Sequence, residues 1–191
     1  SVHDSIEKAW LKNPQKKLRL LGYPDDVIDR VLVNPEPKDI GPDSIVVYLE
    51  QRSFTEFNGY TIGGKFDMSA EGIVQDTKST SAFAWVNGTR DEENILQMSL
   101  YRWLESRQDH PKITEDHGAI NYVFTDWQKA QARSNPKYPQ RRVENKPLPL
   151  LSLDETENYI VGKLALIEKY KDTPEPKIPE CTDEELWRSS P

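Results

Sequence analysis

Two neighbouring segments, residues 60–68 and 71–80, have the pattern of a β-hairpin, and this pattern constrains the fold more than any other feature. The residues around their junction, Ser69-Ala70-Glu71-Gly72, are typical of a turn. Successive side chains of a strand point to opposite faces, so the pairing of the two segments decides which residues can meet.

The hairpin carries three residues of chemical interest, Asp67, Asp76 and Lys78. Asp76 and Lys78 are two positions apart and therefore share one face of their strand. An even number of turn residues pairs Asp67 with Val74 and places it on that same face, whereas an odd number sends it to the other face. The even register also groups four apolar residues on the opposite face, as a core face requires: Ile62, Phe66, Met68 and Ile73. The patterning therefore favours convergence of the two carboxylates and the lysine.

Two carboxylates and a lysine on one face suit phosphodiester hydrolysis assisted by one or two divalent cations. Mg²⁺ prefers oxygen ligands and keeps several waters, so Asp67, Asp76 and the backbone carbonyl of Thr77 suffice to hold it. The metal would polarise a phosphoryl oxygen and generate hydroxide. Lys78 would orient or deprotonate the attacking water. The alternative is a surface hairpin with a solvated ladder of Asp and Lys side chains, because Asp-x-Lys is a common tripeptide.

Two pairs of polar residues at helical spacing accompany the hairpin. Gln97 and Tyr101 stand four positions apart in a predicted helix of about 16 residues, and therefore share a face. His3 and Glu7 have the same spacing in a predicted N-terminal helix over residues 1–12. Taken singly, the first pair is also explained as the polar edge of an amphipathic helix, and His3 as an exposed histidine.

The other predicted elements complete a mixed fold. In chain order they are short helices within 14–32, an extended stretch over 45–49, a helix beginning near Arg90 with a capping box of Thr89 and Glu92, a strand over 118–126, and a helix from Leu153 to Tyr170 capped by Ser152 and Glu155. Helices flanking a central, mostly antiparallel sheet predict an α/β or α+β sandwich. With 191 residues, we expect one domain over 1–171 followed by a proline-rich acidic tail over 172–191.

The distribution of charge along the sequence indicates what kind of molecule the protein can bind. The net charge of −7 argues against a general polyanion binder, but residues 129–146 are strongly basic. In this basic stretch Trp127 and Tyr138 would stack on unpaired bases. Five side chains are candidates for contacts with DNA phosphates: Lys129, Arg133, Lys137, Arg141 and Arg142. The alternative is a solvated, proline-broken loop.

The composition also limits the setting of the protein. No apolar run approaches the roughly 20 residues that span a bilayer. The single cysteine, Cys181, excludes an internal disulfide framework. We therefore expect a cytoplasmic protein that acts away from a membrane.

The polar motifs, taken in order, resemble those of the PD-(D/E)XK nuclease superfamily, and more narrowly of its RecB-like and phage-exonuclease branch. The four motifs are His3-Asp-Ser-Ile-Glu7, Gly63-Gly64-Lys65-Phe66-Asp67, Asp76-Thr77-Lys78 and Gln97-Met-Ser-Leu-Tyr101, and they span residues 1–105. The resemblance implies a restriction-endonuclease-like fold with Mg²⁺ or Mn²⁺ held by Asp67 and Asp76. Many RecB-like members carry four cysteines for an iron–sulfur cluster, and this chain departs from that pattern.

The resemblance also implies roles for the remaining motif residues. His3 would be a metal ligand, and Glu7 a further ligand or a residue that supports one. Lys78 would be the catalytic lysine. Gln97 and Tyr101 would contact DNA or steady the site.

These observations lead to one main hypothesis and two alternatives. We expect a metal-dependent deoxyribonuclease, an exonuclease more than an endonuclease, that acts on DNA ends in recombination, repair or phage replication. Its expected partners are DNA and either a second copy of the chain or a recombination or helicase protein. The alternatives are a non-catalytic DNA-binding module with a nuclease-like fold, and a metal-independent protein whose acidic tail recruits a partner.

Overall fold

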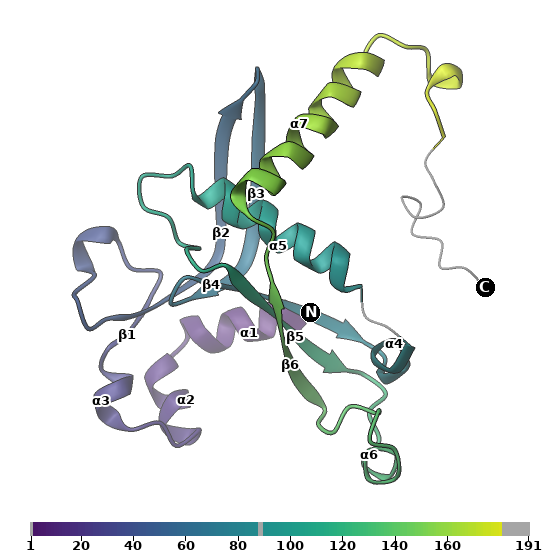
Figure 1. Ribbon diagram of the computed structural model, residues 1–191. Coiled ribbons are helices and arrows are strands. Elements are labelled where there is room, and N and C mark those ends of the chain that lie inside the picture. The colour runs from purple at the N-terminus through teal and green to yellow at the C-terminus, as the bar shows by residue number, and fades with distance from the viewer. Residues whose placement is uncertain (1, 88–89, 181–191) are drawn as a thin grey trace. The chain divides into compact units, whose positions relative to one another are not determined.

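The computed structural model describes residues 2–87 and 90–180, and the chain divides into two compact units, Ser1–Thr156 and Glu157–Pro191. The first unit contains a six-stranded mixed β-sheet with helices on its faces (Figure 1), which confirms the predicted mixed fold. The second unit contains most of helix α7 (Leu153–Tyr170) and the 3-10 helix Glu175–Lys177. Tail residues 181–191 lie outside the described residues, and the domain boundary expected at residue 171 stays a prediction.

The strands lie in the sheet in chain order. They are β1 (Val31–Val33), β2 (Ile45–Phe57), β3 (Tyr60–Ala70), β4 (Ile73–Thr80), β5 (His117–Phe124) and β6 (Val143–Pro149). The pairs β1–β2 and β4–β5 are parallel, and the other three are antiparallel. The helices before α7 are α1 (Val2–Leu11), α2 (Pro14–Leu20), α3 (Asp25–Ile28), α4 (Ala82–Asn87), α5 (Asp91–Glu105) and α6 (Lys129–Ser134), and a 3-10 helix spans Pro37–Asp39.

Two tight turns join β2, β3 and β4. Asn58 and Gly59 have φ of 50° and 80°, and Glu71 and Gly72 have φ of 50° and 81°. Positive φ at both positions is the geometry of a two-residue turn that matches the twist of a hairpin. A Cβ at Gly72 would lie 2.2 Å from Thr114 Oγ1, so this position also requires glycine for space.

The register of the β3–β4 hairpin differs from the expected one by two positions. Ser69, and not Asp67, pairs with Val74, because the turn consists of only Glu71 and Gly72. The expected pairing of Asp67 with Val74 is therefore wrong. A shift of two residues does not by itself move a side chain to the other face, because side chains of a regular strand repeat every two positions.

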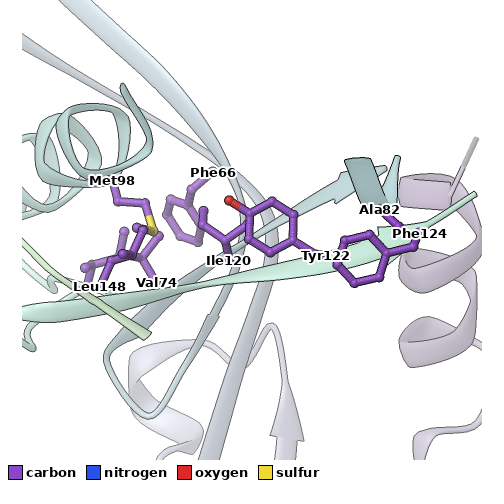
Figure 2. Close-up of a cluster of buried hydrophobic side chains, with 9 residues drawn as sticks. Phe66, Val74, Ala82, Met98, Ile120, Tyr122, Phe124 and Leu148 are labelled. Carbon is purple, nitrogen blue, oxygen red and sulfur yellow. The ribbon is translucent and has the colours of Figure 1, made fainter. Parts of the chain in front are cut away.

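Two hydrophobic clusters cover opposite faces of the sheet. Figure 2 shows the first, in which Met98 of α5 points toward Val74 and Leu148 of the sheet. In the second, Val47 and Leu49 of β2 pack against Trp10 of α1. Consecutive residues of β2 thus face α5 and α1 in turn, as alternation along a strand requires.

The predicted grouping of Phe66 with Met68 on one face is wrong. Phe66 is 2% exposed in the cluster beside α5, whereas Met68 packs against the cluster beside α1. The alternation reverses between them, at Asp67. The β2–β3 ladder pairs Leu49 with Met68 and Gln51 with Phe66 but omits the intervening residues, of which Glu50 has φ of 54°. Such a local departure from extended backbone bends a strand and redirects the side chains beyond it.

Helix α5 is tied to the long hairpin by a buried carboxylate. Glu105 is 1% exposed, and it accepts hydrogen bonds from the Ser53 hydroxyl and, at 2.9 Å, from the Lys112 amide. Burial, and then the negative charge of Glu105, raises the pKa of Tyr48 on the neighbouring part of β2. These bonds hold the C-terminal end of α5 on β2.

The capping box expected for α7 is confirmed. Glu155 accepts hydrogen bonds from the amide and hydroxyl of Ser152 at 2.8 and 2.7 Å, and the Glu155 amide donates to the Ser152 hydroxyl at 3.2 Å. The bonds from Ser152 lower the pKa of Glu155. The cap expected at the start of α5 involves Thr89, which lies outside the described residues.

Among the helices of residues 2–87 and 90–180, none has the combination of length and apolar character that crossing a bilayer requires.

We expect Gly118→Ala to lower the free energy of unfolding by about 1–3 kcal/mol, because overpacking a close-packed core is destabilising. A Cβ there would lie 2.7 Å from Met98 Sδ and 3.0 Å from the Val74 carbonyl oxygen. Gly162→Ala is the matched control, since a Cβ at Gly162 meets nothing within 4 Å. Urea denaturation of both variants measures the difference, and equal stabilities would contradict the packing of β5 against α5.

Candidate active site

Asp67 lies where β3 separates from β4. The β3–β4 ladder contains three pairs and ends at Met68 and Gln75. Beyond it, Asp67 Oδ2 accepts a long hydrogen bond of 3.4 Å from the Thr77 amide. A side-chain carboxylate thus takes the place that a backbone carbonyl of β3 would occupy in a continued ladder. This bond brings the carboxylate of Asp67 to the backbone of β4, one residue from Asp76.

Asp76 is a buried carboxylate beside a lysine. The residue is 4% exposed, and its Oδ2 lies 2.8 Å from Lys78 Nζ. This contact does not satisfy hydrogen-bond geometry, so Oδ2 is a buried acceptor with an ion-pair partner and no hydrogen bond. Burial of a carboxylate is costly unless other charges or donors compensate it. The arrangement leaves one Asp76 oxygen available to a further positive charge.

Lys78 begins a chain of polar contacts that leads onto α5. Its Nζ donates to Gln97 Oε1 at 3.2 Å, and Gln97 Nε2 donates to the Tyr101 hydroxyl at 3.0 Å. Gln97 and Tyr101 stand one helical turn apart, which is why their side chains can bond to each other. The Lys78 side chain remains 36% exposed, so its ammonium group is held in place and still accessible to solvent.

Gly64 lets α5 approach the sheet at this point. A Cβ at Gly64 would lie 3.2 Å from the Tyr101 ring and 3.3 Å from Leu104. The Tyr101 ring also packs against Phe66, with centroids 6.4 Å apart. Gly64 and Phe66 of the Gly-Gly-Lys-Phe-Asp motif thus position α5, while Asp67 contributes its carboxylate.

Asn94 and Tyr122 are two polar residues beside Lys78 and Gln97 that were not predicted from the sequence. Asn94 of α5 is buried and donates to the Tyr122 hydroxyl at 3.2 Å, and Tyr122 of β5 is the strand neighbour of Lys78. The spacing of Asn94 to Gln97 could have indicated the first, because residues three apart share a helix face. The alternation within β5 could have indicated the second.

Glu50 was also missed, and it lies opposite Asp67 in the β2–β3 pair. It forms an ion pair with Lys65, and its side chain is 23% exposed. A positive φ is unfavourable for a residue with a Cβ. No sequence pattern predicts this conformation.

The donors at this place fit a hard divalent cation. Asp76 Oδ2 is buried without a hydrogen bond, and Asp67 supplies a second carboxylate. The amide and the carbonyl of one strand residue point toward the same neighbouring strand, so the Thr77 carbonyl points to the side of Asp67. Among the described residues, no three His, Cys, Asp or Glu side chains converge as metal ligands. The available set is therefore two carboxylates and a carbonyl, with water completing the coordination as Mg²⁺ prefers.

The two other predicted site residues cannot be placed. His3 and Glu7 fall in α1, but their side chains lie outside the described residues.

The five predicted DNA-contact side chains, in α6 and the loop before β6, are all exposed. The aromatic residues expected to stack on bases are instead packed against the core cluster. Trp127 Nε1 donates to the Pro139 carbonyl at 2.8 Å, and the Tyr138 hydroxyl accepts from the Gln128 amide at 3.0 Å. These contacts hold the basic loop against the core, and the stacking of the partly buried Trp127 and Tyr138 on bases stays a prediction.

Comparisons with known proteins leave the family open. No family model and no curated protein matches the chain. A solved structure described as "Crystal structure of SSO0001" is similar at 18% identity with a TM-score of 0.41, over 68% of this chain and 52% of the other. This chain therefore spans about half the length of that structure.

We expect Glu50→Gly to be more stable than Glu50→Ala by about 1 kcal/mol, because glycine adopts positive φ without a Cβ penalty. Both variants lose the ion pair with Lys65, so their difference reports the backbone alone. Thermal and urea unfolding measure it. If the alanine variant proves equally stable, the conformation that reverses the strand faces beside Asp67 is refuted.

Proposed function

We propose that this protein is a metal-dependent deoxyribonuclease whose active site contains Asp67, Asp76 and Lys78. The observation that supports it best is the contact of Lys78 with a buried Asp76 oxygen that lacks a hydrogen bond, next to a second carboxylate held against the same strand. A solvated surface ladder of Asp and Lys would not bury Asp76 to 4% exposure.

Each residue has a chemical role in this proposal. Asp67, Asp76 and the Thr77 carbonyl hold Mg²⁺ or Mn²⁺, with one or two ions. When bound, the metal supplies Lewis-acid polarisation of the phosphoryl oxygen and acidifies water. The ammonium group of Lys78 donates hydrogen bonds to the attacking water and to negative charge that develops on the phosphate. Gln97 keeps Lys78 in position, and Tyr101 keeps Gln97 in position.

We further propose that the substrate is DNA and that cleavage starts at ends. The exposed basic side chains of α6 and its following loop supply the positive charge that a polyanion requires. Retention of both carboxylates and the lysine together favours catalysis over binding alone.

The first test is degradation of linear and circular DNA, single- and double-stranded, with Mg²⁺, Mn²⁺ or EDTA. We expect metal-dependent loss of the linear forms, and Lys78→Met should slow it by about 10²–10⁴-fold, the usual contribution of a positioned acid–base or charge-stabilising group. The control is Lys38→Met, which removes an ammonium group that is 76% exposed and distant in sequence from the site. Binding without degradation would indicate a non-catalytic DNA-binding module, and absence of both would reject the proposal.

The second test is metal binding without DNA. Mg²⁺ and Mn²⁺ should raise the melting temperature of the protein, because a ligand that binds only the folded state stabilises it by mass action. Asp76→Asn should abolish this increase, whereas Asp116→Asn, which changes a carboxylate that is 83% exposed, should preserve it. An unchanged metal effect in Asp76→Asn would place the ion elsewhere.

A further inference from the structure

An exposed aromatic residue lies just after the strand that carries Asp76 and Lys78. In α4, Ala82 and Trp85 face the core, with the Trp85 ring 5.4 Å from Tyr122 in an edge contact. Phe83 and Val86 follow the same spacing on the outer face, and they are 73% and 39% exposed. The inward contacts of Trp85 fix this orientation, so α4 presents Phe83 to solvent.

Helix α4 and the basic stretch lie at the same end of the sheet (Figure 1). Strands β4 and β5 are parallel and end level, with Thr80 beside Phe124, so the segments that follow them emerge together. The Thr125 amide donates to the Thr80 carbonyl at 2.9 Å, and Asp126 accepts from the Ala82 amide at 2.7 Å. These bonds join the start of α4 to the segment that leads into α6.

Residues 125–142, which lead from β5 toward β6 at this end of the sheet, carry a net positive charge. Asp126 is the sole acid of the sequence between 125 and 142, and it caps α4. The exposed cations of the same segment are Lys129, Arg133, Lys137, Arg141 and Arg142. Because Trp127 and Tyr138 pack against the core, Phe83 is the aromatic residue that this surface offers in an exposed position.

An exposed aromatic ring at the same end of the sheet as several exposed cations suits single-stranded nucleic acid. Bases stack on exposed aromatic side chains while Lys and Arg contact phosphates, and every base has a face that can stack. In a duplex the base faces are already covered by neighbouring pairs. At the rise of a β-strand, the path from Lys78 to Ser81 before α4 is about 10 Å, so a strand bound here can continue into the candidate active site.

We propose that α4, α6 and the loop that follows form a binding surface for single-stranded DNA, in which Phe83 stacks on an unpaired base next to the site. This inference rests on the proposed function for the identity of the bound polymer. It adds that the strand reaches Asp76 and Lys78 unpaired and that Phe83 contributes to the selection of single strands.

The test measures binding of fluorescein-labelled single-stranded and duplex DNA by anisotropy in EDTA, so that cleavage plays no part. Phe83→Leu keeps an apolar side chain but removes the ring, and we expect it to weaken single-strand binding by roughly tenfold, as loss of one stacking contact does, with duplex binding unchanged. Phe83→Trp keeps an aromatic ring and should bind single-stranded DNA as tightly as the wild type does. Phe54→Leu is the matched control, because Phe54 is 55% exposed on β2, outside this surface, and its replacement should have no effect.

Two further measurements separate stacking from general attraction. A 2-aminopurine base in the single strand should be quenched by the wild-type protein and by Phe83→Trp, and not by Phe83→Leu. Arg141→Ala combined with Arg142→Ala should weaken both kinds of DNA and flatten the salt dependence.

The outcomes for the two proposals are distinguishable. Three results would each overturn the inference, whatever the cleavage assay gives. The first is that Phe83→Leu binds single strands as tightly as the wild type. The second is that it loses the same affinity for single strands and duplex, and the third is that the wild type does not bind single strands. Ring-dependent binding without metal-dependent degradation would support this surface and reject the nuclease.

Discussion

The early end of the β3–β4 ladder is the constraint on which the candidate site depends. In a continued antiparallel pair, the Thr77 amide would bond to a backbone carbonyl, and Asp67 would stand clear of the β4 backbone. Separation of the strands after three pairs instead draws the Asp67 carboxylate to that amide. The carboxylate of Asp67, although it belongs to β3, then lies at the backbone of Thr77, next to Asp76 in β4. Two carboxylates at neighbouring positions repel each other unless positive charge is close. Lys78 supplies positive charge from within the protein, at 2.8 Å from the buried Asp76 oxygen that lacks a hydrogen bond.

The reversal of strand faces at Glu50 and Asp67 extends this arrangement. It exchanges the faces of the residues beyond it: Leu49 packs toward α1, whereas Ser53, four positions later, bonds to Glu105 of α5. The buried bonds of Glu105 hold α5 at one end, and the glycine at position 64 allows its close approach. Gln97 can reach Lys78 only because α5 is fixed on this face. The bend in the sheet and the polar chain on α5 are therefore parts of one structure, and loss of either would move the lysine.

Much of the fold and of the candidate site could be predicted from the sequence. The features that could not be predicted depend on tertiary packing. Alternation alone predicted a common face for Asp67, Asp76 and Lys78, and the contact of Lys78 with Asp76 confirms it for these two residues. The error of two residues in register does not affect this pair, because side chains repeat every two positions. The full length of β2 was missed although Asn58-Gly59 is a strong hairpin indicator. Reversal at Glu50 could not be predicted, since a positive φ at glutamate follows from tertiary packing. The packing of the partly buried Trp127 against the core also depends on tertiary structure, because an aromatic residue in a basic segment fits stacking and core packing equally well.

Exceptions to ordinary backbone and hydrogen-bonding preferences lie close together in the structure, around the candidate site. The turns at Asn58-Gly59 and Glu71-Gly72 and the capping box of α7 follow ordinary backbone preferences. The exceptions are a glutamate at positive φ, a ladder that ends early and a buried carboxylate oxygen without a hydrogen bond. The glutamate lies opposite Asp67 on β2, and the other two features lie at Asp67 and Asp76 or one residue from them. Backbone strain and a buried acceptor without a hydrogen bond lower stability, so an arrangement that only had to fold would have no reason to gather them in one place. The cation proposed for this site would relieve the electrostatic part of this cost and thereby stabilise the folded protein.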